Sequence, residues 1–219
     1  PAEGGVTTEV RDRILLIGLD RPAKMNGYTP QMARQLVDAF ERLDEDEDLW
    51  CGVLFGHGDH FTAGLDLPKF RDAMKGGRRY KRTERVDPMG LGRRCRKPLV
   101  TAVQGVTFTL GIELMLAGDI VVAADDCRFS QLEPLRGIHA AGGATIRFVD
   151  RGGWGNAMYH LLTSDEFDAA EAHRIGLVQE VVPAGTQLDR AIELARVICE
   201  GAPLAVQATK ASSARYLRD

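Results

Sequence analysis

The chain has 219 residues, 44% of them hydrophobic, which is enough to bury a substantial core in one domain. Its formal net charge is only −3, although the charges are unevenly spread along the chain. No apolar stretch approaches the roughly 20 residues that span a bilayer, and no basic segment leads into an apolar one near residue 1. These features argue against the membrane-spanning and signal-peptide classes, and we expect a globular, non-secreted protein of the cytoplasm.

The first part of the chain alternates a strand with a helix. Residues 13–19 are mostly apolar and predict a strand. Thr29 followed by Pro30 is a good N-cap and first helical residue, and the helix is predicted to end in the acidic run 44–48. Its buried face is predicted from apolar residues at helical spacing, namely Met32, Leu36, Phe40 and Leu43.

Further strands are predicted around Val53 and Val100 and at residues 120–123, each separated by helical or glycine-rich connections. This alternation favours βα units and a mainly parallel sheet. From residue 189 onward the sequence predicts helix, and Pro203 is expected to start a second one.

The most informative stretch is 102–119, because an acid, Glu113, lies in an otherwise apolar helix. Residues 99–103 predict a buried strand, and Gly105 and Gly111 interrupt the pattern, so the sequence predicts a strand, a turn and then the helix. The N–H groups of a first helical turn lack internal partners and can hold an anion or a developing oxyanion. Glu113 either takes part in chemistry there or complements the helix dipole, and this stretch alone does not decide.

Four other segments carry recognisable patterns. Residues 20–26 read DRPAKMN, residues 63–66 read AGLD, Glu133 lies in the run FSQLE, and a later block extends over residues 162–178. In this order, together with residues 102–119, they resemble the enoyl-CoA hydratase/isomerase, or crotonase, superfamily over nearly the whole chain.

The resemblance implies an α/β fold, a crotonase-like spiral of repeated ββα units in residues 1–185 that is followed by a C-terminal helical segment in residues 186–219. Relatives typically continue for several tens of residues further, so this segment is expected to be incomplete relative to the family. Family members commonly form trimers or pairs of trimers, and we expect a homotrimer or a dimer of trimers.

The resemblance also implies a site for an acyl-CoA substrate. The backbone N–H groups of Leu65 and Leu110 correspond to the family's oxyanion hole, and Glu113 and Glu133 correspond to its two hydratase glutamates. The hole would stabilise the enolate of the thioester, and losing one such donor typically costs about 3 kcal/mol. Further substrate or coenzyme A contacts are implied at Lys24, Met25, Ala63, Gly64, Asp66, Leu67 and Gly111.

The presence of both acids favours hydration of an enoyl-CoA. One acid and one base that flank a water can deprotonate it as it attacks the β-carbon, while a proton reaches the α-carbon. A double-bond isomerase of the same fold needs only one carboxylate and is the runner-up, and a non-catalytic acyl-CoA-binding or RNA-binding relative is the alternative outside enzymes. Without the resemblance, Glu133 would be interpreted as a surface glutamate in a proline-containing loop.

The chain departs from the family at two glycine positions. Many hydratases carry three consecutive glycines where this chain has Thr109-Leu110-Gly111. Because glycine serves positive φ angles and close ligand approach, we expect a tighter or differently shaped pocket here. Residues 140–143 also lack the proline that is common before this loop, so the resemblance does not fix fine substrate specificity.

Basic residues concentrate in residues 69–97, which hold 12 Lys and Arg against 3 Asp and Glu. Three interpretations stay open: a partly mobile segment around Gly76-Gly77 that attracts coenzyme A phosphates, an RNA-binding surface, and a solvated surface or oligomer contact. Tyr80 supplies little base stacking, which argues against nucleic acid as a partner.

The spacing of cysteines and histidines indicates neither a disulfide framework nor a metal site. The four cysteines lie far apart and form no CxxC pair, which predicts reduced, structural thiols. The five histidines lack HxxxH or HExxH spacing, so no metal is expected, and His139 is a candidate pocket residue because it lies near the Glu133 loop. No cofactor is expected, since coenzyme A is part of the substrate.

Overall fold

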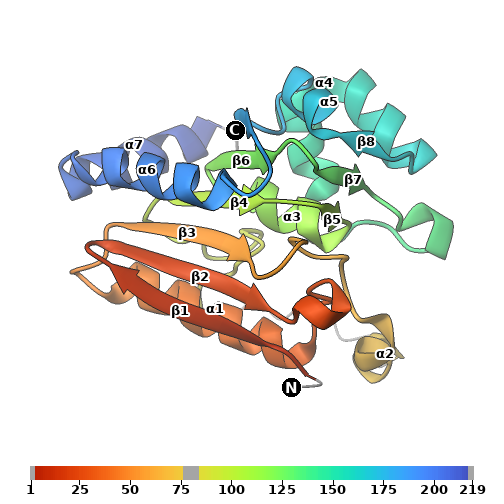
Figure 1. Ribbon diagram of the computed structural model, residues 1–219, viewed down its shortest axis with the longest axis horizontal. Coiled ribbons are helices and arrows are strands. Elements are labelled where there is room, and N and C mark those ends of the chain that lie inside the picture. The colour runs from red at the N-terminus through yellow and green to blue at the C-terminus, as the bar shows by residue number, and fades with distance from the viewer. Residues whose placement is uncertain (1–2, 76–83, 217–219) are drawn as a thin grey trace.

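The computed structural model describes residues 3–75 and 84–216. Its main sheet has six strands in the order β1-β2-β3-β4-β6-β9 (Figure 1). Only β1 is antiparallel to its neighbour, and all later pairs of this sheet are parallel, which confirms the mainly parallel sheet. The strands are β1 (Gly5–Arg11), β2 (Ile14–Asp20), β3 (Cys51–Gly56), β4 (Leu99–Val103), β6 (Ile120–Ala124) and β9 (Glu180–Val182).

A second sheet of three strands has the order β5-β7-β8, formed by β5 (Val106–Phe108), β7 (Arg128–Ser130) and β8 (Phe167–Asp168). The chain crosses from the main sheet to this one twice, from β4 to β5 and from β6 to β7, and a helix follows each pair. These are ββα units of the expected spiral. They correct one prediction, because β5 lies where the sequence suggested only a turn before the helix, and three residues are too few to show a period.

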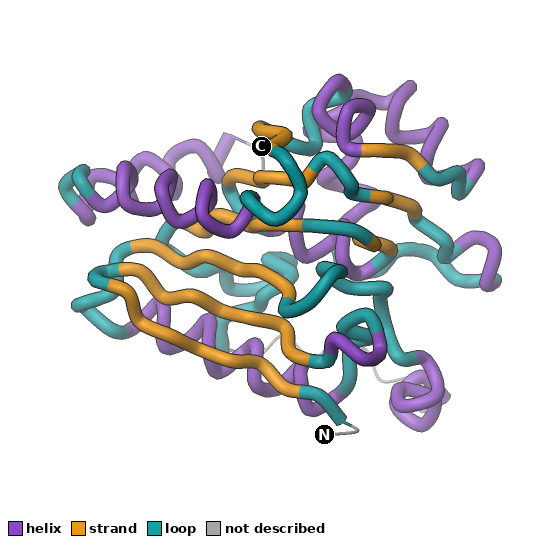
Figure 2. The backbone as a smooth tube through the Cα atoms, in the orientation of Figure 1, coloured by secondary structure: helices purple, strands orange, loops and turns teal. Residues whose placement is uncertain are grey.

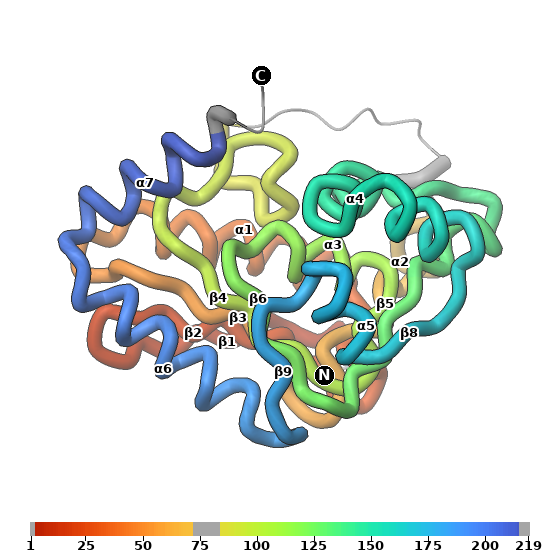
Figure 3. Tube along the Cα trace, turned by 90° about the horizontal axis from the view of Figure 1, so that it is seen from above, coloured from red at the N-terminus to blue at the C-terminus, as the bar shows by residue number. Residues whose placement is uncertain are grey.

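Helices cover both faces of the main sheet, and Figure 3 shows α1 and α6 on opposite sides of its strands. The alternation along β2 explains this, because Leu15 and Ile17 belong to the core cluster under α1, whereas Ile14 and Leu16 pack with the buried side of α6. None of the described helices is long and apolar enough to cross a membrane. The helices are α1 (Pro30–Glu45), α2 (Leu67–Lys75), α3 (Leu110–Ala117), α4 (Ala144–Thr163), α5 (Ala169–Arg174), α6 (Gln187–Cys199) and α7 (Pro203–Tyr216).

The predicted N-cap and first helix are confirmed. The Thr29 hydroxyl accepts a hydrogen bond from the Met32 N–H at 3.2 Å, and α1 begins at Pro30. The strands predicted near Val53 and Val100 and the helix start predicted at Pro203 are also present. All four apolar positions that were expected to face the core are buried, namely Met32, Leu36, Phe40 and Leu43.

The loops after β2, β3 and β5 gather at one end of the sheets, beyond the carboxyl ends of the parallel strands (Figure 2). Asn26 joins two of these loops, because its side-chain N–H groups donate to the His57 and His60 carbonyls at 2.9 and 2.8 Å. Its side-chain oxygen accepts from the Arg21 N–H at 2.7 Å. In α/β folds this end of the strands is where ligands bind.

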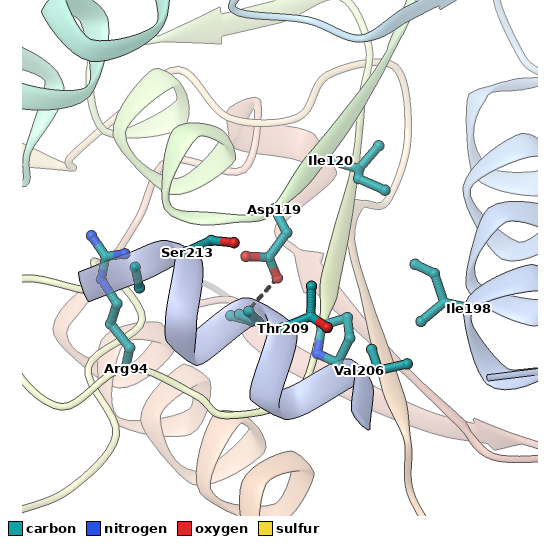
Figure 4. Close-up of a pocket in the computed structure, with 10 residues that line it drawn as sticks. Arg94, Asp119, Ile120, Ile198, Val206, Thr209 and Ser213 are labelled. Carbon is teal, nitrogen blue, oxygen red and sulfur yellow. Dashed lines mark hydrogen bonds and ion pairs between the residues drawn. The ribbon is translucent and has the colours of Figure 1, made fainter. Parts of the chain in front are cut away.

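The opposite end of β4 and β6 carries a smaller hollow of about 400 Å³ beside α6 and α7 (Figure 4). Lys210 on α7 forms an ion pair with Asp119 at 2.6 Å and donates to the Lys97 carbonyl at 2.9 Å. Asp119 also accepts from the Leu99 N–H at 2.8 Å. These bonds fasten α7 to the beginning of both strands.

Three arginines of the basic segment pair with the acidic side of α1, which favours a structural role for them over phosphate or RNA binding. Residues 76–83, which include Gly76-Gly77 and Tyr80, lie outside the described residues. The pairs are Arg85 with Asp38 and Glu41, both at 2.7 Å, and Arg93 and Arg96 with Asp44 at 2.7 and 3.1 Å.

Candidate active site

The loops beyond the carboxyl ends of the strands enclose a cavity of about 840 Å³, a size that suits a small-molecule ligand. Its wall comes from the loop after β3, the start of α3, the Glu133 loop and the loop that precedes α4. Of the residues implied by the resemblance, the structure brings seven to this wall: Ala63, Leu65, Asp66, Leu67, Leu110, Glu113 and Glu133.

The Leu65 N–H lies on a loop that is held on both sides. The Tyr28 N–H donates to the Gly64 carbonyl at 2.8 Å, and the Asp66 N–H donates to the Tyr28 carbonyl at 2.9 Å. Gly64 has a φ of +99°, which side-chain-bearing residues rarely adopt. The Leu65 N–H donates to no other residue in the described part of the chain, so it is available to a ligand.

The Leu110 N–H comes from the first residue of α3 and likewise has no acceptor among the described residues. Thr109 before it has φ 51° and ψ −113°, a strained conformation for a β-branched residue. Its hydroxyl oxygen lies where a Cβ on Gly64 would collide with it, so the two amide-bearing loops are in contact. Thr109 thus keeps a glycine-like backbone, while its side chain and that of Leu110 line a wall that glycines would leave bare.

Glu113 lies in the first turn of α3, is only 5% exposed, and forms no ion pair with a described residue. Its Oε1 accepts hydrogen bonds from the Gly142 N–H at 2.6 Å and the Ala144 N–H at 3.3 Å. Burial raises the pKa of Glu113, while these N–H groups and the charge of Arg147 pull the pKa back down. The carboxyl is therefore held firmly by neutral donors, with its charge only partly stabilised.

Glu133 stands across the same cavity at the start of a 3-10 turn, Pro134–Arg136, and is 7% exposed. Burial is the largest cause that raises the pKa of Glu133 to about 7, and the nearby Glu113 charge raises the pKa further. A hydrogen bond from the Glu133 backbone N–H partly offsets this rise. Two carboxyls that interact in this way titrate as a coupled pair. Burial and their mutual repulsion therefore disfavour ionising both carboxyls at once, which suits a site that needs one acid and one base.

The Lys24–Met25 turn lies beside the cavity rather than in its wall. Both residues are exposed, and the Met25 carbonyl accepts from the Ala63 N–H at 2.9 Å, which seats the turn against the Leu65 loop. Gly64 and Gly111 do not line the cavity either. Gly111 packs closely on Thr62, where an added Cβ would lie 3.0 Å from the Thr62 methyl carbon.

Sequence reasoning missed three polar side chains. Arg21 forms an ion pair with Asp66 at 2.8 Å, so the cavity-lining carboxylate is already neutralised. Gln131 is buried two residues before Glu133, and in the amide orientation that satisfies both of its ends it donates to the two Glu133 oxygens at 2.7 and 3.0 Å. Arg147 lies behind Glu113. Only Arg147 offered a signal, as a basic residue inside the mostly apolar run 144–149, whereas Arg21 and Gln131 lie in mixed runs.

His139 lines the cavity next to the Glu133 loop, as its position in the sequence suggested. Within the described ranges, no three His, Cys, Asp or Glu side chains are grouped so that they could hold a metal ion. The four cysteines are free thiols, and three of them are buried. The polar groups along the described wall of the cavity are carboxyls, backbone amides, Thr109, His139 and Arg136.

Comparison with known proteins gives the class to which this fold and site belong. The family model for enoyl-CoA hydratase/isomerase matches residues 9–219. The chain belongs to that family, within the crotonase superfamily.

Individual relatives agree with this assignment. The chain is 36% identical over 209 residues to enoyl-CoA hydratase EchA19 of Mycobacterium tuberculosis, covering 91% of this chain and 76% of that protein. It is 30% identical to the hydroxycinnamoyl-CoA hydratase-lyase of Pseudomonas fluorescens, covering 94% and 76%. A crystal structure of a probable enoyl-CoA hydratase/isomerase from Mycobacterium abscessus superposes with a TM-score of 0.94 at 46% identity, covering 98% of this chain and 83% of the other.

Proposed function

We propose that this protein is an enoyl-CoA hydratase, which adds water across the 2,3 double bond of an enoyl-CoA thioester. One observation carries the proposal: Leu65 and Leu110, whose backbone N–H groups have no acceptor among the described residues, line the same cavity as the buried Glu113 and Glu133. The hydratase names of the relatives at 30–36% identity support it.

In the proposed reaction the thioester oxygen accepts hydrogen bonds from the Leu65 and Leu110 N–H groups, and a water lies between Glu113 and Glu133. The ionised carboxyl takes a proton as the water oxygen bonds to C3, and the C2=C3 π electrons move toward the thioester oxygen. The two N–H groups stabilise the resulting enolate. The protonated carboxyl then gives a proton to C2, so one water has been added and the pair again holds one proton.

The coenzyme A moiety is assigned to the side of the cavity where Lys24 and Met25 lie. Their turn is exposed and seated against Ala63, next to the thioester position. Coenzyme A belongs to the substrate, and the two carboxyls and two amides complete the reaction without a further cofactor. Lys24→Ala is expected to raise KM for crotonyl-CoA while kcat changes little.

The proposal is tested by offering purified protein crotonyl-CoA. Hydration is expected to remove the absorbance of the conjugated enoyl thioester and to give a product heavier by one water. Formation of that absorbance from a 3-enoyl-CoA, with crotonyl-CoA left unchanged, would contradict hydration and indicate the isomerase. Inertness toward both substrates would contradict an enzyme of either kind, and bound RNA would then identify a binding protein.

We further propose a homotrimer or a dimer of trimers in the cytoplasm. Four large apolar side chains on α4 are solvent-exposed in the single chain, Ile146 at 61%, Trp154 at 70%, Tyr159 at 61% and Leu162 at 71%. Exposed apolar surface of this kind marks association sites, and free thiols suit a reducing compartment. Light scattering after gel filtration should give three or six chain masses, and a monomer would contradict the proposal.

A further inference from the structure

Arg147 on α4 is a buried cation that the proposed reaction does not use. It is 7% exposed, and among the described residues no carboxylate lies within ion-pairing distance of it. Its two terminal nitrogens donate to backbone carbonyls, one to Gly142 at 3.2 Å and the other to Met89. Burying a guanidinium on neutral acceptors alone is costly, so its position calls for an explanation.

The Gly142 carbonyl that Arg147 binds belongs to the loop that holds Glu113. The Gly142 N–H and the Ala144 N–H both donate to Glu113 Oε1, while the Gly142 carbonyl accepts from Arg147. Gly143 has a φ of +110°, and a Cβ there would collide with the guanidinium. Arg147 therefore fixes the backbone of 142–144 from behind, and this backbone fixes one oxygen of Glu113.

The second attachment ties this loop to a neighbouring one. Met89 lies in a turn that Asp87 organises, with Asp87 accepting from the Met89 N–H at 3.0 Å and the Gly92 N–H at 2.8 Å. Arg147 thus joins two loops that have no sequence proximity. Glu113 lines the cavity, and no described residue donates a hydrogen bond to its Oε2, which lies against Gly142, where an added Cβ would collide with it.

The charges around this pair come from several elements. Glu113 faces Glu133 across the cavity and Arg147 behind it, and Arg147 itself faces Arg94, Arg151 and Asp87. Burial, together with Arg94 and Arg151, lowers the pKa of Arg147 to about 10, so it still carries its charge at neutral pH. This charge favours the ionised form of Glu113.

We propose that Arg147 is a positioning residue for hydration: through the 142–144 loop it fixes Oε1 of Glu113 and so orients this carboxyl in the cavity. This inference rests on the proposed function, because it assigns Glu113 a part in the chemistry. If Arg147 had a purely structural role, it would hold the same loops together, but its removal would leave the pKa of Glu113 unchanged.

The chain offers a matched control in Arg151, one turn further along α4. It is a half-buried arginine that donates only to backbone carbonyls, at 3.1 Å to Leu116 and 2.7 Å to Gly118, and it holds the far end of α3. Arg147→Met and Arg151→Met therefore remove similar hydrogen bonds from an arginine to backbone carbonyls, but only the first removes a charge beside Glu113.

The experiment compares the pH dependence of kcat/KM for crotonyl-CoA in the wild type, Arg147→Met, Arg147→Lys and Arg151→Met. In Arg147→Met we expect kcat to fall about 10- to 100-fold with KM little changed, and the acidic limb to move up by about one pH unit. Arg147→Lys should move the acidic limb of the pH profile at least partly back toward its wild-type position. Arg151→Met should leave this limb at its wild-type position. Identical pH profiles for Arg147→Met and Arg151→Met would overturn the proposal.

A second readout separates this inference from the proposed function. In Glu133→Gln protein, carbon NMR of labelled glutamate can follow the Glu113 carboxyl, assigned as the signal lost on a further Glu113→Gln change, without the coupled Glu133 and without any turnover. Removing Arg147 should raise the midpoint of this titration, whereas removing Arg151 should not. If the wild type fails to hydrate crotonyl-CoA, the proposed function fails, while an unmoved Glu113 titration would overturn the role of Arg147 independently.

Discussion

The molecule places a carboxylate at each end of α3, and the two are treated in opposite ways. Asp119, just beyond the end of the helix, is paired with Lys210 at 2.6 Å and accepts from the Leu99 N–H (Figure 4). Glu113, in the first turn, has backbone N–H groups as its only described hydrogen-bond donors and faces a second carboxyl, Glu133.

The different surroundings of Asp119 and Glu113 indicate a structural role for the first and a catalytic role for the second. A paired acid such as Asp119 fastens one element to another, here α7 to the start of β4 and β6. A buried acid that shares a cavity with a like charge is costly to ionise, so the protein spends stability to keep it there. Raised pKa values of this kind concentrate at catalytic sites. The 840 Å³ cavity therefore contains acids with raised pKa values, as a catalytic site does, whereas the 400 Å³ hollow contains an acid that is paired with a lysine.

The sharpest way to break this contrast is to neutralise each acid. Glu113→Gln and Glu133→Gln should each lower kcat for hydration about 10³-fold, because each removes a proton donor or acceptor, with coenzyme A binding retained. Asp119→Asn is the matched change in the other hollow and should leave kcat within about twofold of the wild type, since it touches no reacting group. Wild-type rates in either glutamine variant would remove that residue from the mechanism.

The contact between the two amide-bearing loops gives the next largest effect. In Gly64→Ala the new Cβ meets the Thr109 hydroxyl and must displace either the Leu65 or the Leu110 N–H, so we expect kcat to fall about 100-fold. Gly185→Ala is the control, because Gly185 has a similar φ of +90° but nothing within 4 Å. Equal kcat values in the two variants would show that the loops do not act together.

The raised pKa of Glu133 predicts a pH-dependent stability. The folded protein holds this proton up to about pH 7, against an ordinary value of 4.5, so the stabilisation is complete below 4.5 and is lost as the pH rises through 7. At about pH 8, Glu133→Gln should therefore exceed the wild type in unfolding free energy by about 2 kcal/mol, and this gain should vanish near pH 4.

The control for this effect is Glu166→Gln. Glu166 pairs with Arg128 at the surface, and this hydrogen bond lowers its pKa, so its removal should give no gain in alkaline solution. Urea denaturation across pH measures both variants. A Glu133→Gln protein that is less stable than the wild type at about pH 8 would contradict the raised pKa.

The smallest effect belongs to the paired acid. Lys210→Met removes the ion pair with Asp119 and the bond to the Lys97 carbonyl, and we expect a loss of about 1 kcal/mol in unfolding free energy without a change in kcat. Denaturation and hydration assays on the same sample measure both quantities. A large loss of kcat would show that the two ends of α3 are coupled, and the contrast drawn here would fail.

Local patterns were enough to predict much of the fold. The Thr29-Pro30 helix start, the strands around Val53 and Val100 and the mainly parallel sheet all follow from capping and apolar periodicity, which are properties of neighbouring residues. The spiral itself came from the resemblance. Strand β5 was missed because three residues carry no period, and β8 has only two.

The candidate site was predicted less completely. The resemblance gave seven residues that the structure brings to one cavity, among them Leu65, Leu110, Glu113 and Glu133, and the roles of these four are the proposals made above. The support behind Glu113 could not be predicted, because the Gly142 and Ala144 N–H groups that hold it lie 29 and 31 residues further along the chain. The unusual backbone of Thr109 is equally hidden, since sequence patterns assign such angles to glycine.

The account depends most on the convergence of the two leucine N–H groups on one oxygen. A crystal structure with acetoacetyl-CoA measures this directly. We expect the thioester carbonyl oxygen to lie within about 3 Å of both the Leu65 and the Leu110 nitrogens. A bound ligand whose carbonyl oxygen lies away from either nitrogen would contradict the account.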